Sequence, residues 1–278
     1  RASGSTSTSL GFNSSASGES SISAGFDAKA TSTNSSAFGY GAKALGINSL
    51  SLGANSSALG LSSQAVGDLS LATGSRSIAI GADSRSGLSR DVSIPQPDDI
   101  DGNPVNPIIR SRSSSNTIAI GYQATAGSFD EEEQEAIGNA SIAIGTASQA
   151  LADGSIAFGL SSNASQLSST AIGAFAAATG VNSSAFGGES IASATNSTAV
   201  GRFSTANGSN SIAIGTSSEG SGENSTVTGD SATASGTNSS AFGQNATASG
   251  SASTSVGQGS KASKTGATAV GYLAQSTA

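Results

Sequence analysis

A glycine recurs every fourteen residues along almost the whole chain, and this period constrains the fold more than any other feature. The 278 residues contain 17 such anchor glycines, whose spacing is broken only twice. A unit this short cannot bury a core of its own, so it must be one coil of a solenoid that is stabilised by stacking on its neighbours. The anchors are Gly11, Gly25, Gly39, Gly53, Gly67, Gly81, Gly121, Gly145, Gly159, Gly173, Gly187, Gly201, Gly215, Gly229, Gly243, Gly257 and Gly271.

The residues around each anchor follow a fixed pattern. Ser stands four residues before the anchor in 15 copies, and Ala stands two residues before it in 12. Val, Ile, Leu, Phe or Ala stands immediately before it in 16 copies, and Ala stands five residues after it in 14. Alternation with period two predicts β-strands, and the Asn and Gly residues between them predict tight corners where φ is positive. Each coil is therefore expected to hold two short strands of about five residues.

The small Ala and Ser side chains predict a thin coil, because a bulky residue would not fit between two strands so close together. Stacked coils pair in parallel about 4.8 Å apart, so residues 1–278 are expected to form one elongated all-β domain about 80 Å long. Alternation alone leaves open whether the large apolar row immediately before each anchor faces the interior or the outside.

If Ala fills the coil, this large apolar row points outward, where a continuous apolar stripe on a soluble protein marks an interface. The row is therefore expected to lie in the core or at an interface. Its largest members are Ile80, Ile120, Ile144, Phe158, Ile172, Phe186, Ile214 and Phe242.

Composition excludes several kinds of chemistry. The chain has no Cys and no His, so disulfides and imidazole or thiolate catalysis are excluded, and no base accompanies its many serines. A formal net charge of −7 with only 10% charged residues disfavours a nucleic-acid partner. We therefore expect no enzymatic activity, no cofactor and no metal site. The alternative is a β-helical polysaccharide-processing enzyme, which would need paired carboxylates in a cleft.

Two insertions break the period. The spacing from Gly81 to Gly121 is 40 residues, 26 more than one coil, and the extra segment at about 88–113 holds all four prolines of the chain. Proline has no backbone N–H to donate to the hydrogen bonds between strands, so this segment is expected to leave the sheet. The second insertion lies at about 128–137. Both begin after the same part of the coil and are expected to emerge from one corner of neighbouring coils.

Insertions in repeat proteins often bind partners, so these two are candidate binding loops. Arginines of the first insertion could face acids of the second; the alternative is a tolerated excursion whose charges are merely solvated. Asp98, Asp99 and Asp101 lack the 12-residue spacing of a calcium loop. The candidate contact residues are Arg90, Asp98, Asp99, Arg110, Arg112, Phe129, Glu131, Glu132 and Glu133.

The runs Ser77–Gly81, Asn116–Gly121 and Asn210–Gly215, each containing Ile-Ala-Ile-Gly, resemble the head repeat of YadA-type trimeric autotransporter adhesins. The resemblance covers nearly the whole chain outside the insertions and extends to the long Acinetobacter fibres of this family. It implies a left-handed parallel β-roll of 14-residue coils, assembled as a homotrimer at the tip of a virulence-associated fibre on the bacterial cell surface. It further implies attachment to host extracellular matrix proteins or abiotic surfaces without catalysis. The coiled-coil stalk and outer-membrane anchor of such a fibre would lie outside this fragment.

Overall fold

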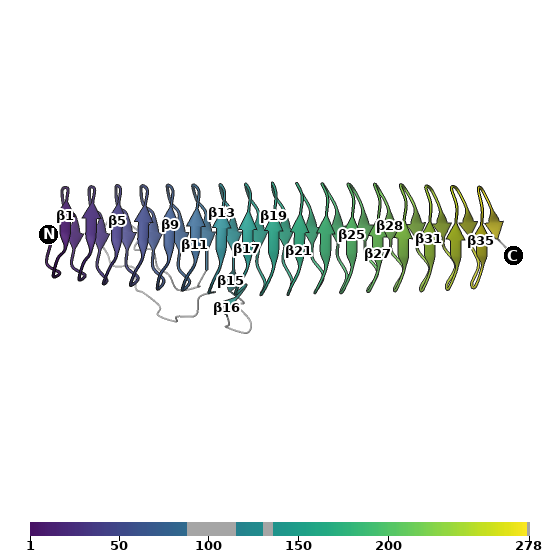
Figure 1. The fold of residues 1–278 in the computed structure, drawn as a ribbon, viewed down its shortest axis with the longest axis horizontal. Coiled ribbons are helices and arrows are strands. Elements are labelled where there is room, and N and C mark those ends of the chain that lie inside the picture. The colour runs from purple at the N-terminus through teal and green to yellow at the C-terminus, as the bar shows by residue number, and fades with distance from the viewer. Residues whose placement is uncertain (88–114, 130–135, 277–278) are drawn as a thin grey trace, which may run out of the picture. The chain divides into compact units, whose positions relative to one another are not determined.

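The computed structural model describes residues 1–87, 115–129 and 136–276 (Figure 1). Within these residues every element of regular secondary structure is a β-strand. The strands form a parallel solenoid of about 17 coils with a spacing of about 14 residues, as the glycine period predicts. The solenoid divides into two compact units, Arg1–Ile142 and Ala143–Ala278.

Each coil of the first unit contains a three-residue strand, a corner, a two-residue strand and a second corner. The prediction of five-residue strands is wrong, because the two corners occupy nine of the fourteen residues (14 − 3 − 2). The three-residue strands are β1 (Thr8–Leu10), β3 (Ile22–Ala24), β5 (Ser36–Phe38), β7 (Leu50–Leu52), β9 (Gln64–Val66), β11 (Ile78–Ile80) and β13 (Ile118–Ile120). The two-residue strands are β2 (Ser15–Ala16), β4 (Lys29–Ala30), β6 (Lys43–Ala44), β8 (Ser57–Ala58), β10 (Leu71–Ala72), β12 (Arg85–Ser86) and β14 (Thr125–Ala126).

The second unit repeats the same alternation, with β17 (Ile142–Ile144) at the boundary. The other three-residue strands are β19 (Ile156–Phe158), β21 (Thr170–Ile172), β23 (Ser184–Phe186), β25 (Thr198–Val200), β27 (Ile212–Ile214), β29 (Thr226–Thr228), β31 (Ser240–Phe242), β33 (Thr254–Val256) and β35 (Thr268–Val270). The two-residue strands are β18 (Gln149–Ala150), β20 (Asn163–Ala164), β22 (Ala177–Ala178), β24 (Ile191–Ala192), β26 (Thr205–Ala206), β28 (Glu219–Gly220), β30 (Thr233–Ala234), β32 (Thr247–Ala248), β34 (Lys261–Ala262) and β36 (Gln275–Ser276).

Strands one coil apart pair in parallel and in register. Ser36 pairs with Leu50 in the first unit, and Thr170 pairs with Ser184 in the second, each fourteen residues further on. The same register holds across the first insertion, where Ile78 pairs with Ile118. The insertion therefore leaves the geometry of the ladder unchanged.

The interior of the coil is built from two Ala rows. The Ala two residues before the anchor and the Ala five residues after it are both buried, as Ala157 and Ala178 show with 0% exposure. Val227 is the largest fully buried side chain and stands in a position that other coils give mainly to Ala or Ser. The expectation of a thin, Ala-filled coil is confirmed.

Some buried serines donate hydrogen bonds within the corners of the coil, whereas the Oγ atoms of others in the same row, such as Ser49, Ser141 and Ser211, have no partner among the described residues. Ser77, four residues before an anchor, donates from Oγ to the Gly74 carbonyl at 2.6 Å. At the other corner, Ser204 donates from Oγ to the carbonyl of the anchor Gly201 at 2.8 Å. In both cases the acceptor lies three residues earlier and also accepts the backbone N–H of the same serine at 3.2 Å, so the hydroxyl adds a second hydrogen bond to the turn.

The anchor glycine is required for two reasons. At Gly159 φ is +137°, a conformation that side-chain-bearing residues rarely adopt. A methyl group added there would also lie 2.5 Å from the Gly173 carbonyl oxygen, in the next coil. Many coils contain a second glycine, which is needed only because the backbone of the next coil lies so close to it. A methyl group at Gly180 would lie 2.1 Å from the Ala194 carbonyl oxygen.

Candidate functional site

The large apolar row immediately before the anchors lies on the outer surface of the three-residue strands. In the first unit Leu52 is 45% exposed, and in the second Phe158 is 52% exposed. The question that alternation left open is therefore resolved, because the Ala row on the same strands takes the interior. Ile80, Ile172, Phe186, Ile214 and Phe242 are also exposed, while Ile120 and Ile144 are half-buried.

A second row of mixed character accompanies the first on the same face. Seven of its 17 members are Ile or Leu, and the other ten are Ser, Thr or Gln. It stands three residues before the anchors and contains the exposed residues Ile22 and Ile212. Ile78, Ile118 and Ile156 in this row are half-buried. The period-two alternation contained the signal, since residues two apart on a strand share a face. We call these two rows together the apolar face.

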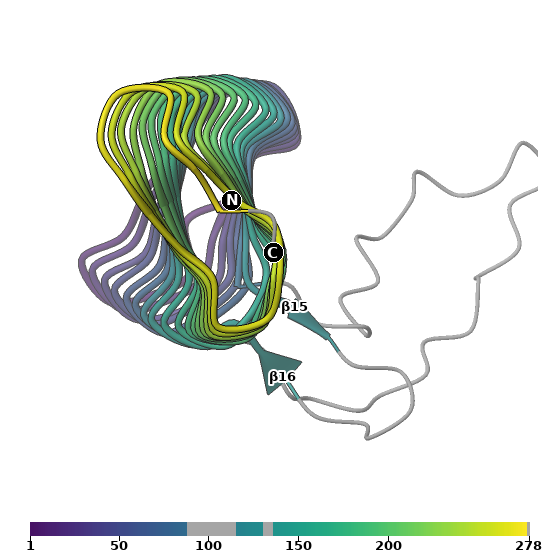
Figure 2. The same ribbon diagram turned by 90° about the vertical axis from the view of Figure 1, so that its right-hand side faces the viewer.

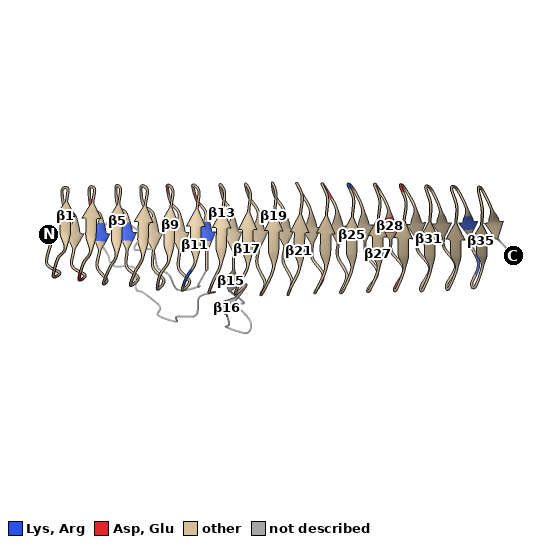
Figure 3. Ribbon diagram, viewed as in Figure 1, with Lys and Arg blue, Asp and Glu red and all other residues tan. Residues whose placement is uncertain are grey.

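The outer surface of the two-residue strands is mainly polar. It carries Lys29, Lys43 and Arg85 in the first unit, and Glu219 and Lys261 in the second (Figure 3). Ile191 is an exposed apolar exception at these positions, and Leu71, at the equivalent position in the first unit, is buried. Each unit thus has one apolar and one polar sheet surface.

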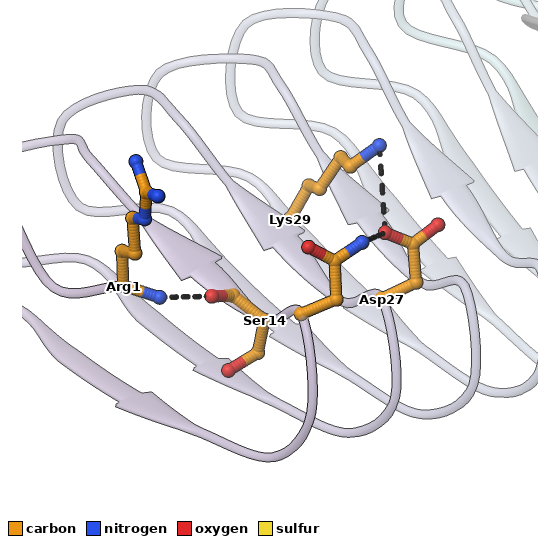
Figure 4. A network of polar contacts seen from close by, with 5 residues as sticks. Arg1, Ser14, Asp27 and Lys29 are labelled. Atoms are coloured by element: carbon orange, nitrogen blue, oxygen red, sulfur yellow. Dashed lines mark hydrogen bonds and ion pairs between the residues drawn. The ribbon is translucent and has the colours of Figure 1, made fainter.

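A small polar network joins the first coils of the first unit (Figure 4). Lys29 Nζ lies 3.6 Å from Asp27 Oδ1, which also accepts a hydrogen bond of 2.9 Å from Asn13 Nδ2. The amino group of Arg1 donates to the carbonyl of Ser14. The Lys29 and Asp27 side chains are 44% and 34% exposed, so the ion pair is screened by solvent and contributes little to stability.

Lys29 lies beside Lys43 in the ladder, one coil apart. Burial lowers the pKa of the Lys43 ammonium, and the charge of Lys29 lowers it further, while Asp27 acts in the opposite direction. The two ammonium groups therefore form a local concentration of positive charge on the polar surface of this unit.

The first insertion leaves the solenoid at Gly87, after β12, and the chain re-enters at Ser115. Gly87 donates from its backbone N–H to the Ala126 carbonyl at 2.9 Å and accepts from the Thr73 hydroxyl. Ser115 donates from its backbone N–H to Asn139 Oδ1 at 2.8 Å. The candidate contact residues Arg90, Asp98, Asp99, Arg110 and Arg112 lie outside the described residues, as does Asp101 of the rejected calcium loop.

The second insertion begins and ends as a two-stranded antiparallel ladder. β15 (Ser128–Phe129) pairs with β16 (Ala136–Ile137), with Phe129 opposite Ala136, and both strands project from the coil (Figure 2). Phe129 therefore lies in the stem of a hairpin. The candidate residues Glu131, Glu132 and Glu133 lie outside the described residues.

A glycine marks the point where each insertion leaves its coil. Gly87 and Gly127 both stand six residues after their anchors, with φ of 69° and 82°. At the same point other described coils carry residues such as Leu45, Thr179 and Ser249. The left-handed glycine redirects the chain out of the coil. This signal was present in the sequence and was missed.

The described parts of the chain offer no cluster of metal-binding side chains. Within them, no three His, Cys, Asp or Glu side chains gather closely enough to hold a metal ion. Nor do these residues contain a helix of the length and apolar character needed to cross a membrane.

The pattern of matching repeats decides the family. The profile of the YadA head domain repeat matches residues 2–28, 30–56, 58–84, 136–162, 152–176, 164–190, 178–204, 192–218, 221–246 and 248–274. The chain belongs to the YadA head family. The comparison with curated proteins finds no match.

YadA head domains belong to trimeric autotransporter adhesins, a family of non-enzymatic surface proteins. The matched segments stop at residue 84 and resume at residue 136, so the family repeat omits all of the first insertion and most of the second. The insertions are therefore the main departure of this chain from the YadA head pattern. No comparison tests the relation to Acinetobacter fibres, which stays a prediction.

Proposed function

We propose that this chain forms the head of a homotrimeric adhesin on the bacterial cell surface, and that it attaches the cell to extracellular matrix proteins or abiotic surfaces without catalysis. A coiled-coil stalk and an outer-membrane anchor complete the fibre in this proposal. The family membership supports the adhesive role, because YadA head domains are parts of such fibres.

The observation that carries the proposal is the one-sided apolar face. Phe158 is 52% exposed and Ile214 is 41% exposed in the single chain, and equivalent residues follow in neighbouring coils. A soluble monomer rarely exposes a contiguous apolar surface of this length. Two further copies of the chain would cover it and leave the polar surfaces in contact with solvent.

The insertions are the proposed adhesive contacts. They leave neighbouring coils at equivalent positions, Gly87 and Gly127, so each protomer would display them as a pair. In a trimer each pair occurs three times, and a weak site gains avidity on a repetitive target such as a fibrous protein.

Two measurements test the proposal separately. Light scattering coupled to size-exclusion chromatography is expected to give a mass near three chains; a folded monomer with cooperative unfolding would contradict the assembly. Attachment to collagen, fibronectin and glass is then compared between the intact chain and a chain that lacks 88–113 and 128–137. Loss of attachment by a deletion variant that is still trimeric supports the loops, and full attachment assigns the contact to the repeat surface.

A further inference from the structure

An unusual group of side chains occupies one corner of three successive coils in the second unit. The position two residues after the anchor holds Phe175, Glu189 and Phe203, each with φ of 58°. Small or polar residues such as Ser161 and Ser217 hold this left-handed position in the flanking coils. A bulky aromatic residue is uncommon in this conformation. Two exposed phenylalanines here therefore call for an explanation other than local backbone preference.

The backbone fixes these three residues in a line. Glu189 N–H donates to the Ala174 carbonyl at 2.8 Å, and Phe203 N–H donates to the Gly188 carbonyl at 3.1 Å. Coils stack about 4.8 Å apart, so the two phenylalanines stand about 10 Å apart with Glu189 between them. Phe175 is 55% exposed and Phe203 is 39% exposed.

One half of this group already binds a cation from the same chain. The Arg202 guanidinium carbon lies 4.2 Å from the centre of the Phe203 ring, a cation–π contact. One guanidinium nitrogen of Arg202 also lies 3.9 Å from Glu189 Oε1. Arg202 stands one residue after its anchor, between the aromatic ring of its own coil and the carboxylate of the preceding coil.

Among the described residues, no cationic side chain is seen over the Phe175 ring. One coil earlier, the position equivalent to Arg202 is Gly188, and a methyl group added there would meet, apart from its chain neighbours, only the Ala174 carbonyl oxygen, at 3.8 Å. Gly188 is followed in the chain by Glu189, whose carboxylate also pairs with Arg202, and it lies one coil after Phe175. The position therefore has an acidic and an aromatic neighbour, as Arg202 has, with the order of the two coils reversed and no cationic side chain of its own.

We propose that this corner binds an arginine or lysine side chain of a partner polypeptide, above Gly188 and between Phe175 and Glu189. The partner cation takes the place that an arginine at position 188 would fill, and the net charge of −7 favours its approach. The proposal names a ligand class for the repeat surface. It rests on the proposed adhesive function for its biological setting, but not on the insertions.

The test measures binding of a biotinylated peptide with four arginines separated by glycines, by biolayer interferometry at 150 mM NaCl. Phe175→Ser introduces the residue found at this position in neighbouring coils, and Glu189→Gln removes the charge but keeps the shape. Each substitution is expected to weaken binding at least about fivefold. A peptide with glutamine in place of arginine is expected not to bind.

Gly188→Arg provides a sharper test, because it supplies the missing guanidinium from within the chain. It is expected to abolish peptide binding. Gln244→Arg adds the same charge to the same row four coils away and controls for the change in net charge. Unchanged binding by Phe175→Ser and Glu189→Gln, or equal effects of the two arginine variants, would overturn the proposal.

The oligomeric mass of each variant is measured in parallel. A loss of assembly in Phe175→Ser would assign the corner to a contact between protomers and would also overturn the proposal. Attachment to matrix-coated surfaces is scored separately. Failure of the adhesive function is therefore distinguishable from failure of peptide binding.

Discussion

Asn210 donates from its side-chain Nδ2 to Oδ1 of Asn224, one coil further on, at a distance of 3.0 Å. Both residues are in the left-handed conformation, with φ of 57° and 54°. The same bond links Asn196 to Asn210 and Asn224 to Asn238. Asparagine thus serves the corner in two ways, because it tolerates positive φ and it connects each coil to the next.

Removing one amide from this ladder is expected to destabilise the fold modestly. Asn210→Gly keeps the backbone conformation and loses two exposed hydrogen bonds, so we expect a loss of about 1 kcal/mol per chain in the free energy of unfolding. Asn210→Ala adds the penalty of a left-handed alanine and should lose about 1 kcal/mol more. Urea unfolding measures both.

The reciprocal variant is Ala252→Asn, at the same point of a coil that follows Asn238. It should extend the ladder and raise the unfolding midpoint. A midpoint for Asn210→Ala equal to that of the wild type would show that the ladder contributes nothing.

An alanine at an anchor position is expected to disrupt the stack. Gly159→Ala combines the φ of 137° with a methyl group 2.5 Å from a carbonyl oxygen of the next coil, so we expect a loss of at least about 2 kcal/mol per chain. Gly220→Ala is the matched control. Its methyl group would meet the Ser225 Oγ at 3.3 Å, and most coils carry Ala at this position. Similar melting temperatures for both variants would contradict this account of the anchor.

The interior is expected to reject larger side chains. Ala157→Leu or Ala178→Leu places three extra carbon atoms in a position with 0% exposure, and overpacking of this kind costs about 1–3 kcal/mol per site. Gln244→Lys, on an exposed corner, should be nearly neutral. Thermal unfolding that is unchanged in both leucine variants would rule out the thin coil.

A polar residue on the apolar face is expected to act on assembly rather than on the coil. Phe158→Ser removes a side chain that is 52% exposed in the single chain, so the strand content measured by circular dichroism should persist while the trimer dissociates at a higher protein concentration. Gln149→Ser, on the polar surface, should leave the mass unchanged. If Phe158→Ser retains the wild-type mass at every concentration, the apolar face is not the contact.

Alkaline pH is expected to reduce the destabilisation that Lys43 causes. Its pKa in the folded chain lies below the unfolded value of 10.5, so the folded state disfavours the charged form. The free-energy cost of the charged Lys43 side chain is fully present below its pKa in the folded chain. It is relieved as the pH rises from that pKa towards the unfolded value of 10.5. Unfolding of the wild type and of Lys43→Gln across this window should show a stability difference that narrows with pH; a constant difference would contradict the shift.

The 14-residue period and the small Ala and Ser residues predicted the coil, because the size of the side chains in each short segment limits how far apart its two strands can lie. Ala157 alternates with the larger Ile156 and Phe158, and its small side chain lets two strands lie close together. The direction of the Phe158 row could not be derived from alternation alone, since it depends on which of two opposed rows can fill the interior. The corner hydrogen bonds of Ser77 and Ser204 were missed, because a hydroxyl reveals its acceptor only after the chain has turned.

The candidate loops were recognisable as departures from the repeat, but their contacts were not predictable. Arg90 and Glu131 belong to segments without a period, so no neighbouring coil dictates their positions. Phe129 is the exception, because its antiparallel pairing with Ala136 places it in a hairpin stem. The corner of Phe175, Glu189 and Phe203 could not be recognised from alternation, since these residues become neighbours only through stacking.

The unbroken register from Ile78 to Ile118 has a consequence for the evolution and the engineering of such chains. Because the ladder resumes unchanged after 26 additional residues, the corner that begins at Gly87 behaves as a grafting point. We expect foreign sequence to be accepted there without redesign of the scaffold. The position is therefore a defined point at which a chosen epitope can be presented.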